Sequence, residues 1–261
     1  MQIRDAFICE PVRTAVGTFG GAYKDISAQF LGAAVVKGML EKSKLPADAI
    51  DDVLFAQCYA TMDAPALGRV VALDAELPIS VGGLQLDRRC GSGLQTLIYG
   101  VLQVATGASN LVVTGGAESM SNAPFYSTKA RWGIKTPALE LNDALAQGRV
   151  TAGGVNFPVA GGMLETAENV RKDYSISREE QDMFAAESQR RAIAAQQQGL
   201  FDDEIIAVTV PGRKGDTVIS TDETPRATSV ETLAGLRAIR SKVDPESTVT
   251  AGNASTQNDG G

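Results

Sequence analysis

The stretch Leu84-Gln85-Leu86-Asp87-Arg88-Arg89-Cys90-Gly91-Ser92-Gly93-Leu94 places one cysteine where a short strand gives way to a helix. Residues 82–86 have the pattern of a strand, and a second strand-like run follows at residues 111–114. Between them, apolar side chains recur at helical spacing, namely Leu94, Leu97, Ile98, Val101, Leu102 and Ala105. This order predicts a layered α/β fold in which the two strands are parallel and adjacent.

Cys90 lies at the expected N-terminus of this helix and at the carboxyl end of the strand, where open α/β sheets place their chemistry. Unpaired backbone N–H groups and the positive end of the helix dipole favour a thiolate at such a position. Gly91 and Gly93 carry no side chain, so an acyl group can approach the sulfur. We therefore expect a nucleophile, while a small buried cysteine in a tight turn is the alternative.

Further segments make the chain resemble the thiolases, the acetyl-CoA C-acyltransferases, whose nucleophile lies in a Cys-Gly-Ser-Gly motif. Residues 11–21 look like the family's opening strand and turn, and residues 115–121 are similar to its Gly-Gly-x-Glu-x-Met-Ser segment. Residues 166–170, 177–182 and 248–255 follow in the family's order. The resemblance covers essentially all 261 residues.

The resemblance implies an acyl-CoA C-acyltransferase that forms an acyl-cysteine on Cys90 from acyl-CoA or 3-ketoacyl-CoA, with thiolytic cleavage or Claisen condensation. It implies coenzyme A and acyl-CoA as substrates, no tightly bound cofactor, no metal, and a homodimer or homotetramer. Met163 and Ser255 match positions along the pantetheine arm, Thr232 replaces a serine on the same arm, and Arg226 matches an arginine near the adenine nucleotide. Core packing of Met163 and a solvated charge at Arg226 are the alternatives.

The chain departs from the family because it contains no histidine. Thiolases are similar to one another in a Gly-His-Pro segment and in a second cysteine before Gly-Gly, both in their C-terminal part. We therefore expect a truncated or split form, the N-terminal portion of a thiolase. If a general base must be found in this chain, Glu118 is the first acidic residue to test. Cys58 is expected to be a packing residue rather than a second catalytic thiol.

The composition excludes several other classes of protein. The formal net charge is −7 and there is no cluster of lysine or arginine, which argues against nucleic-acid binding. No apolar run is long enough to span a bilayer, and the start lacks the pattern of a signal peptide, so we expect a cytoplasmic protein without a membrane partner. Its three widely spaced cysteines predict neither a disulfide framework nor a metal site.

The resemblance implies the first half of a layered α-β-α core with an inserted α+β loop domain. We predict an N-terminal core domain over residues 1–120, a coenzyme A-binding loop domain over 121–247, and a return to the core, cut short, over 248–261. The local patterns predict a helix over 27–42 capped by Ser27, a strand at 53–56, a long helix after the capping box Ser177–Glu180, a strand over 204–210, and a helix over 230–236.

Two other functions fit part of the pattern. A condensing enzyme related to the ketoacyl synthases shares the fold and also uses a cysteine at a helix start, but residues 166–170 and 177–182 favour a thiolase. A non-catalytic acyl-CoA-binding or assembly fragment is the third hypothesis, and the absence of histidine favours it.

Overall fold

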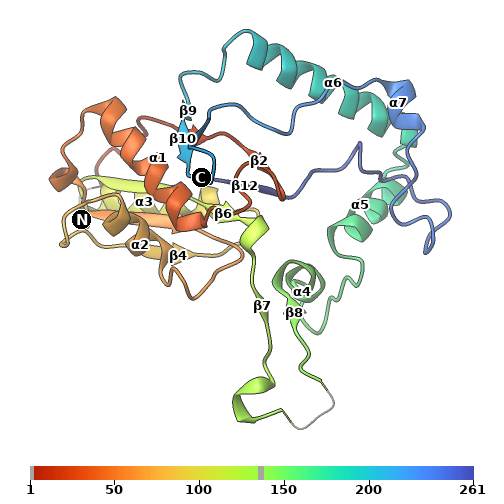
Figure 1. The fold of residues 1–261 in the computed structure, drawn as a ribbon, viewed down its shortest axis with the longest axis horizontal. Helices are drawn as coiled ribbons and strands as arrows, with labels where there is room; N and C mark the ends of the chain where they lie inside the picture. The colour runs from red at the N-terminus through yellow and green to blue at the C-terminus, as the bar shows by residue number, and fades with distance from the viewer. Residues whose placement is uncertain (1–2, 135–137) are drawn as a thin grey trace. The chain divides into compact units, whose positions relative to one another are not determined.

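The computed structural model describes residues 3–134 and 138–261, which form two compact units (Figure 1). Unit 1 comprises the described residues up to Ala123, together with Phe201–Glu223 and Gln257–Gly261. Unit 2 comprises the described residues within Pro124–Leu200 and Thr224–Thr256. The sequence-based division at residues 120 and 247 stays a prediction.

Unit 1 includes Phe201–Glu223 because this segment pairs with the start of the chain. Strand β9 (Ile205–Ile206) runs parallel to β1 (Arg13–Thr14), with Arg13 opposite Ile205. The Arg13 guanidinium also donates to Glu204 at 2.7 Å and to Asp222 at 2.7 Å. A segment about 200 residues away in sequence is thus fixed to the opening strand by both backbone and side-chain contacts.

The main sheet of unit 1 has the order β4-β3-β5, with both neighbours parallel to β3. Its strands are β3 (Asp52–Ala56), β4 (Leu84–Leu86) and β5 (Val112–Gly116). The two strands flanking Cys90, β4 and β5, are parallel as predicted. The prediction that they are adjacent was wrong, because β3 lies between them. Val53 and Leu54 of β3 are fully buried, whereas β4 and β5 are only partly buried, so the most apolar strand takes the central place.

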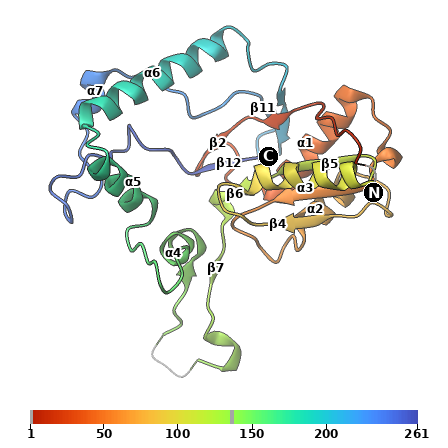
Figure 2. The same ribbon diagram turned by 180° about the vertical axis from the view of Figure 1, so that it is seen from behind.

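Helices cover both faces of this sheet. Helices α1 (Ala28–Ser43) and α2 (Leu67–Asp74) lie in front of it in Figure 1, and α3 (Ser92–Thr106) is in front in the reverse view of Figure 2. Ser27 caps α1 by accepting a hydrogen bond from the Phe30 N–H at 3.3 Å, which confirms the predicted cap. The result is the layered α-β-α arrangement expected from the sequence.

Helix α3 faces the sheet with small and polar residues rather than with its apolar stripe. Gln95, Thr96 and Gly100 are buried, while Leu94 and Leu102 are 65% and 52% exposed. An apolar groove of about 760 Å³ in the same unit is lined by residues 4–13, by β5 and by α3. Much of the apolar surface contributed by α3 is therefore solvent-exposed in the described chain.

A second sheet of unit 1 joins segments from three parts of the chain. Strand β12 (Asn258–Gly260) pairs antiparallel with both β2 (Gly17–Thr18) and β6 (Glu118–Ser119). The strand predicted over residues 204–210 is instead divided at Ala207, and this prediction was wrong in extent. After β9, the chain continues as β10 (Val208–Val210), which pairs with β11 (Thr217–Ile219) in a separate hairpin.

Unit 2 is built mainly from helices. Its elements are β7 (Phe125–Tyr126), a 3-10 turn at Ala130–Trp132, β8 (Asn142–Asp143), α4 (Ala144–Thr151), α5 (Gly162–Asp173), α6 (Arg178–Gln197) and α7 (Val230–Ala234). The predicted capping box is confirmed, since Ser177 and Glu180 each bond the other's backbone N–H at the start of α6. Sequence analysis missed α4, which lies in a stretch rich in proline and glycine and is capped by Asp143.

The close approach of α2 to the sheet gives a test of this packing. A Cβ atom at Gly68 would collide with the carbonyl oxygens of Val53 and Leu84, which are backbone atoms of β3 and β4. We expect Gly68→Ala to lower the free energy of unfolding by about 1–3 kcal/mol, measured by urea denaturation. Gly235→Ala is the matched control, because its φ of −71° suits alanine and its nearest contact is at 3.5 Å. Equal losses in the two variants would contradict this account.

Candidate active site

Cys90 lies in the turn between β4 and α3. Strand β4 ends at Leu86, Gly91 is the N-cap residue of α3, and Ser92 is the first residue of the helix. The Cys90 side chain is exposed. The sequence pattern predicted this strand-to-helix position, and the structure places an accessible thiol there.

The turn that carries Cys90 is held by its own hydrogen bonds. The Ser92 hydroxyl donates to the Arg89 carbonyl at 2.6 Å and accepts from the Arg88 N–H at 2.7 Å. The Gly91 and Ser92 N–H groups donate to the carbonyls of Arg88 and Arg89, at 3.2 and 2.9 Å. Arg89 has a φ of 52°, in the left-handed region that disfavours residues with a side chain. The residue before Cys90 is therefore held in a strained conformation.

Arg89 also connects this turn to the segment after β3. Its guanidinium donates to the Cys58 carbonyl at 3.0 Å and lies 5.9 Å from the centre of the Tyr59 ring. In return, the Cys58 thiol donates to the Arg89 carbonyl at 3.3 Å. Asp87 adds an ion pair with Arg89 at 3.5 Å. Both ends of Arg89, the carbonyl and the guanidinium, are thus tied to residues 58 and 59.

Cys58 behaves as the packing residue that the sequence suggested. Burial raises the pKa of its thiol, and nearby Glu118 and Asp87 add to the increase, against a hydrogen bond with Ser92. Its sulfur lies 3.8 Å from the Ser92 hydroxyl. A thiol with a raised pKa is a poor nucleophile near neutral pH. The other cysteine, Cys9, is exposed.

Glu118 is the first residue of β6, separated from the end of β5 by Ala117 alone. Its Oε2 atom accepts hydrogen bonds from the Cys58 N–H at 2.8 Å and the Tyr59 N–H at 3.3 Å. Its Oε1 atom is buried and has no hydrogen-bond partner among the described residues. Burial raises the pKa of the Glu118 carboxyl, although the two backbone hydrogen bonds oppose the increase. Sequence reasoning missed this support, although the Gly-Gly-x-Glu pattern after a strand was a signal for it.

The four residues predicted to contact coenzyme A all lie in unit 2. Met163 is the second residue of α5 and is 65% exposed, Thr232 lies in α7, and Arg226 and Ser255 lie in loops. Since Cys90 belongs to unit 1, the relation of these residues to it stays a prediction.

Within unit 2, the helices converge on the segment 248–255. Glu168 of α5 is only 2% exposed, and its carboxylate accepts from the N–H groups of Thr248 and Val249 at 2.9 and 2.8 Å. Arg171 pairs with the same carboxylate at 3.0 Å. Burial would raise the pKa of Glu168, but these hydrogen bonds outweigh it and the pKa is lowered.

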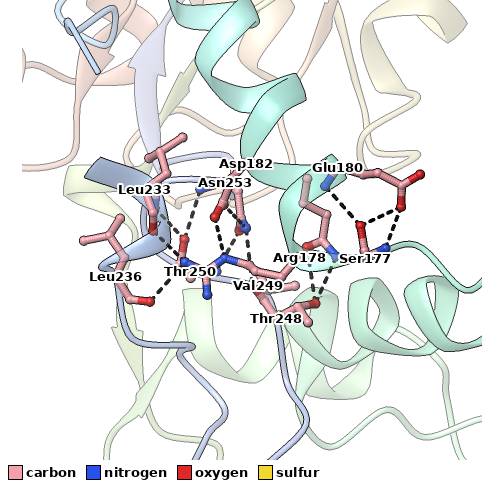
Figure 3. Close-up of polar contacts among 12 residues, drawn as sticks. Ser177, Arg178, Glu180, Asp182, Leu233, Leu236, Thr248, Val249, Thr250 and Asn253 are labelled. Carbon is pink, nitrogen blue, oxygen red and sulfur yellow. Dashed lines mark hydrogen bonds and ion pairs between the residues drawn. The ribbon is translucent and has the colours of Figure 1, made fainter. Parts of the chain in front are cut away.

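Helix α6 holds the same segment from another side (Figure 3). Asp182 is 1% exposed and accepts from the Asn253 amide at 2.9 Å and from Arg178 at 2.7 Å. Arg178 also donates to the carbonyls of Leu233 and Leu236, at 2.6 and 3.0 Å. A buried carboxylate therefore links α6, α7 and the segment 248–255 into one framework.

This framework brings three of the predicted contact residues together. The Arg226 guanidinium donates to the Ala251 carbonyl at 3.0 Å. Leu233, the neighbour of Thr232, packs so closely on Gly252 that a Cβ there would collide with it. Ser255 ends the same segment and is exposed. Met163 belongs to α5, which contacts this segment through Glu168.

Within residues 3–134 and 138–261, no group of three or more histidine, cysteine, aspartate or glutamate residues is arranged to hold a metal ion. No helix in the same part of the chain is both long and apolar enough to cross a membrane.

The environments of the three cysteines predict an order of reactivity. Cys90 is exposed at a helix start, Cys9 is exposed without such a position, and Cys58 is partly buried with a raised pKa. We expect iodoacetamide at neutral pH to label Cys90 first, Cys9 more slowly and Cys58 last, as measured by mass spectrometry of tryptic peptides. Unfolded protein is the control, in which the three rates should converge. Equal labelling of all three in the folded protein would show that Cys90 is not activated.

The Glu168 carboxylate predicts an acid-sensitive step in the stability of unit 2. Because its pKa is lowered on folding, its contribution is fully present above about pH 4.5 and is lost as the pH falls through the folded-state value. Glu168→Ala also removes the acceptor of the buried Val249 N–H and the part-buried Thr248 N–H and breaks the ion pair with Arg171, so we expect a loss of about 3 kcal/mol at pH 7. Urea denaturation between pH 7 and 3 should show a weaker pH dependence in this variant.

Glu140→Ala is the control for this experiment, because Glu140 forms an exposed ion pair with Lys129 at 3.2 Å. Exposed pairs contribute little to stability, so the control should unfold like the unaltered protein. A Glu168→Ala variant with unchanged stability at pH 7 would contradict the assigned role.

Comparisons with known proteins agree with these features. The family described as "Thiolase, N-terminal domain" matches residues 6–261. An acetyl-CoA acetyltransferase of Pseudomonas aeruginosa is 40% identical over 260 residues, covering 99% of this chain and 64% of that protein. The beta-ketothiolase BktB of Cupriavidus necator is 39% identical over 259 residues, covering 98% of this chain and 64% of its own length.

A solved structure gives the same result for the fold. The crystal structure of the Bacillus anthracis acetyl-CoA acetyltransferase has a TM-score of 0.92 and 34% identity, and the match covers 100% of this chain and 64% of that chain. The chain thus spans about two thirds of the length of these relatives. On the match over residues 6–261, supported by the fold and by the position of Cys90, this chain belongs to the thiolase family.

Proposed function

We propose that this chain performs acyl transfer from acyl-CoA thioesters, with Cys90 as the nucleophile that forms an acyl-enzyme. The observation that carries the proposal is the exposed Cys90 thiol at the start of α3, in a turn whose backbone is fixed by Ser92 and Arg89. The relatives named acetyl-CoA acetyltransferase and beta-ketothiolase support the same substrate class.

In the proposed step, the Cys90 thiolate attacks the carbonyl carbon of an acyl-CoA thioester. A bond forms between Sγ and that carbon, the bond to the coenzyme A sulfur breaks, and coenzyme A leaves as a thiolate that takes up a proton. With a 3-ketoacyl-CoA the attack falls on C3, the C2–C3 bond breaks, and its electron pair passes to C2 of acetyl-CoA, which must be protonated.

The negative charge on the carbonyl oxygen needs a hydrogen-bond donor. The N–H groups of Gly91 and Ser92 already donate to the carbonyls of Arg88 and Arg89. We therefore assign the oxyanion to the N–H of Cys90 itself. A single well-placed donor of this kind contributes roughly 10²–10³ in rate.

Carbon–carbon bond chemistry needs more than this nucleophile. Proton transfer at C2 requires a positioned acid or base, worth roughly 10²–10⁴ in rate, and the 261 residues include no histidine for that role. The residues described here therefore support the acylation half-reaction best. Binding of acyl-CoA without turnover is the second candidate function, and the absence of histidine is the observation that favours it.

We assign recognition of coenzyme A to Met163, Arg226, Thr232 and Ser255, as substrate contacts and not as a site for a tightly bound cofactor. Their support is the shared framework of unit 2, which fixes Arg226, α7 and the segment 248–255 against one another. A cationic guanidinium suits the anionic nucleotide end of the molecule.

A cytoplasmic homodimer or homotetramer completes the proposal, with neither nucleic acid nor membrane as a partner. The acidic net charge of −7 and the family resemblance are its support. Light scattering on purified protein tests the assembly, and a monomer at micromolar concentration would contradict it.

The acyl-enzyme is the direct test of the function. We expect acetyl-CoA to add one acetyl group to the protein, located on Cys90 by mass spectrometry, with release of an equivalent amount of coenzyme A. Cys90→Ser should lose this labelling, and Cys9→Ser should retain it because Cys9 is a comparably exposed thiol. No acylation, or acetyl groups spread evenly over the cysteines, would refute the proposal.

A further inference from the structure

We infer that Glu118 is a positioning residue for Cys90, acting through Cys58 and Arg89 to fix the direction of the Cys90 N–H. The inference rests on the proposed acylation of Cys90, and it assigns the orientation of the oxyanion donor to a carboxylate that does not touch the substrate. Three successive contacts carry it.

The first contact joins Glu118 to the segment after β3. One carboxylate oxygen accepts from two consecutive N–H groups, those of Cys58 at 2.8 Å and Tyr59 at 3.3 Å. A carboxylate that accepts two backbone hydrogen bonds fixes the position of both peptide groups. Glu118 thereby sets where Cys58 and Tyr59 lie at the end of β3.

The second contact joins that segment to Arg89. The Cys58 thiol donates to the Arg89 carbonyl at 3.3 Å, and the Cys58 carbonyl accepts from the Arg89 guanidinium at 3.0 Å. The ring of Tyr59 lies 5.9 Å from the same guanidinium. The two residues held by Glu118 are thus the ones that hold Arg89.

The third contact is covalent, because the Arg89 carbonyl and the Cys90 N–H belong to one planar peptide group. In a trans peptide the C=O and N–H bonds point in opposite directions, so fixing one fixes the other. The Ser92 hydroxyl and the Cys58 thiol both donate to the Arg89 carbonyl. The φ of 52° at Arg89 is disfavoured for a residue with a side chain, so this orientation depends on such contacts.

The same geometry argues against Glu118 as the general base of the reaction. Its Oε2 atom is occupied by two N–H groups, and its Oε1 atom is buried away from solvent without a partner among the described residues. A proton carrier needs a path to the reacting atom or to water. Glu118 therefore acts as a support for the turn and not as a proton carrier.

The test compares two reactions of Cys90 that differ in their need for an oxyanion donor. Acylation by acetyl-CoA or by p-nitrophenyl acetate builds a negative oxygen, whereas alkylation by iodoacetamide does not. We expect Glu118→Ala to slow acylation by about tenfold or more and to change alkylation far less. Circular dichroism and thermal unfolding confirm that the variant is folded.

Two further variants examine the links separately. Glu118→Gln keeps an amide oxygen that accepts from both N–H groups, so we expect it to restore acylation close to that of the unaltered protein. Cys58→Ala leaves the Glu118 hydrogen bonds in place and removes only the thiol that donates to Arg89. We expect it to lower the ratio of acylation to alkylation in the same direction, and it keeps the test open if Glu118→Ala does not fold.

Glu223→Ala is the matched control, because the Glu223 carboxylate also accepts from two backbone N–H groups of unit 1. These are the N–H groups of Thr18 at 2.9 Å and Ala22 at 3.1 Å. We expect this variant to lose stability and to keep the ratio of acylation to alkylation. A control that lowers the ratio as much as Glu118→Ala does would overturn the inference.

The remaining outcomes separate this inference from the proposed function. Parallel loss of acylation and alkylation in folded Glu118→Ala, or failure of Glu118→Gln to restore acylation, would overturn the positioning role. If the unaltered protein accepts acetyl groups from p-nitrophenyl acetate but not from acetyl-CoA, the proposed function fails. The comparison of variants with p-nitrophenyl acetate then still decides the role of Glu118.

Discussion

The central position of β3 is the constraint on which the arrangement of unit 1 depends. Ala56 at its end is opposite Leu86 of β4 and Gly116 of β5, so the carboxyl ends of three parallel strands are level. The chain leaves these ends toward Cys58, Cys90 and Glu118, which therefore meet at one edge of the sheet. Open α/β sheets present their chemistry at this edge, and the strand order is what brings the segments of Cys58, Cys90 and Glu118 to it.

In unit 2, two buried carboxylates hold the helices and the segment 248–255 together. Glu168 and Asp182 are almost fully buried carboxylates, each bound both to an arginine and to the segment 248–255. Buried carboxylates cost desolvation energy unless every lone pair finds a donor, so the loop and the helices must adopt one arrangement together. The segment 248–255 is thereby fixed next to Arg226 and α7.

Local signals predicted those parts of the fold that depend on neighbours in sequence. The Ser27 cap, the capping box at Ser177 and the strand-to-helix turn at Cys90 are each determined by residues within one or two turns. The sequence did not show that β3 separates β4 from β5, nor that residues 204–210 divide between two partners. Pairing of distant strands is decided by burial across the whole unit, which no local pattern records.

At the candidate site, too, local sequence patterns predict the position of a residue but not its long-range contacts. The glycines around Cys90 predicted a nucleophile there, but the turn that carries this residue is held by contacts of Arg89 with a residue about 30 positions earlier. A glycine at position 89 would adopt a φ of 52° without strain, yet it would have no guanidinium to reach Cys58, Asp87 and Tyr59. The strain at Arg89 is therefore offset by contacts that only a long cationic side chain provides, and these contacts connect the turn that carries Cys90 to the segment after β3.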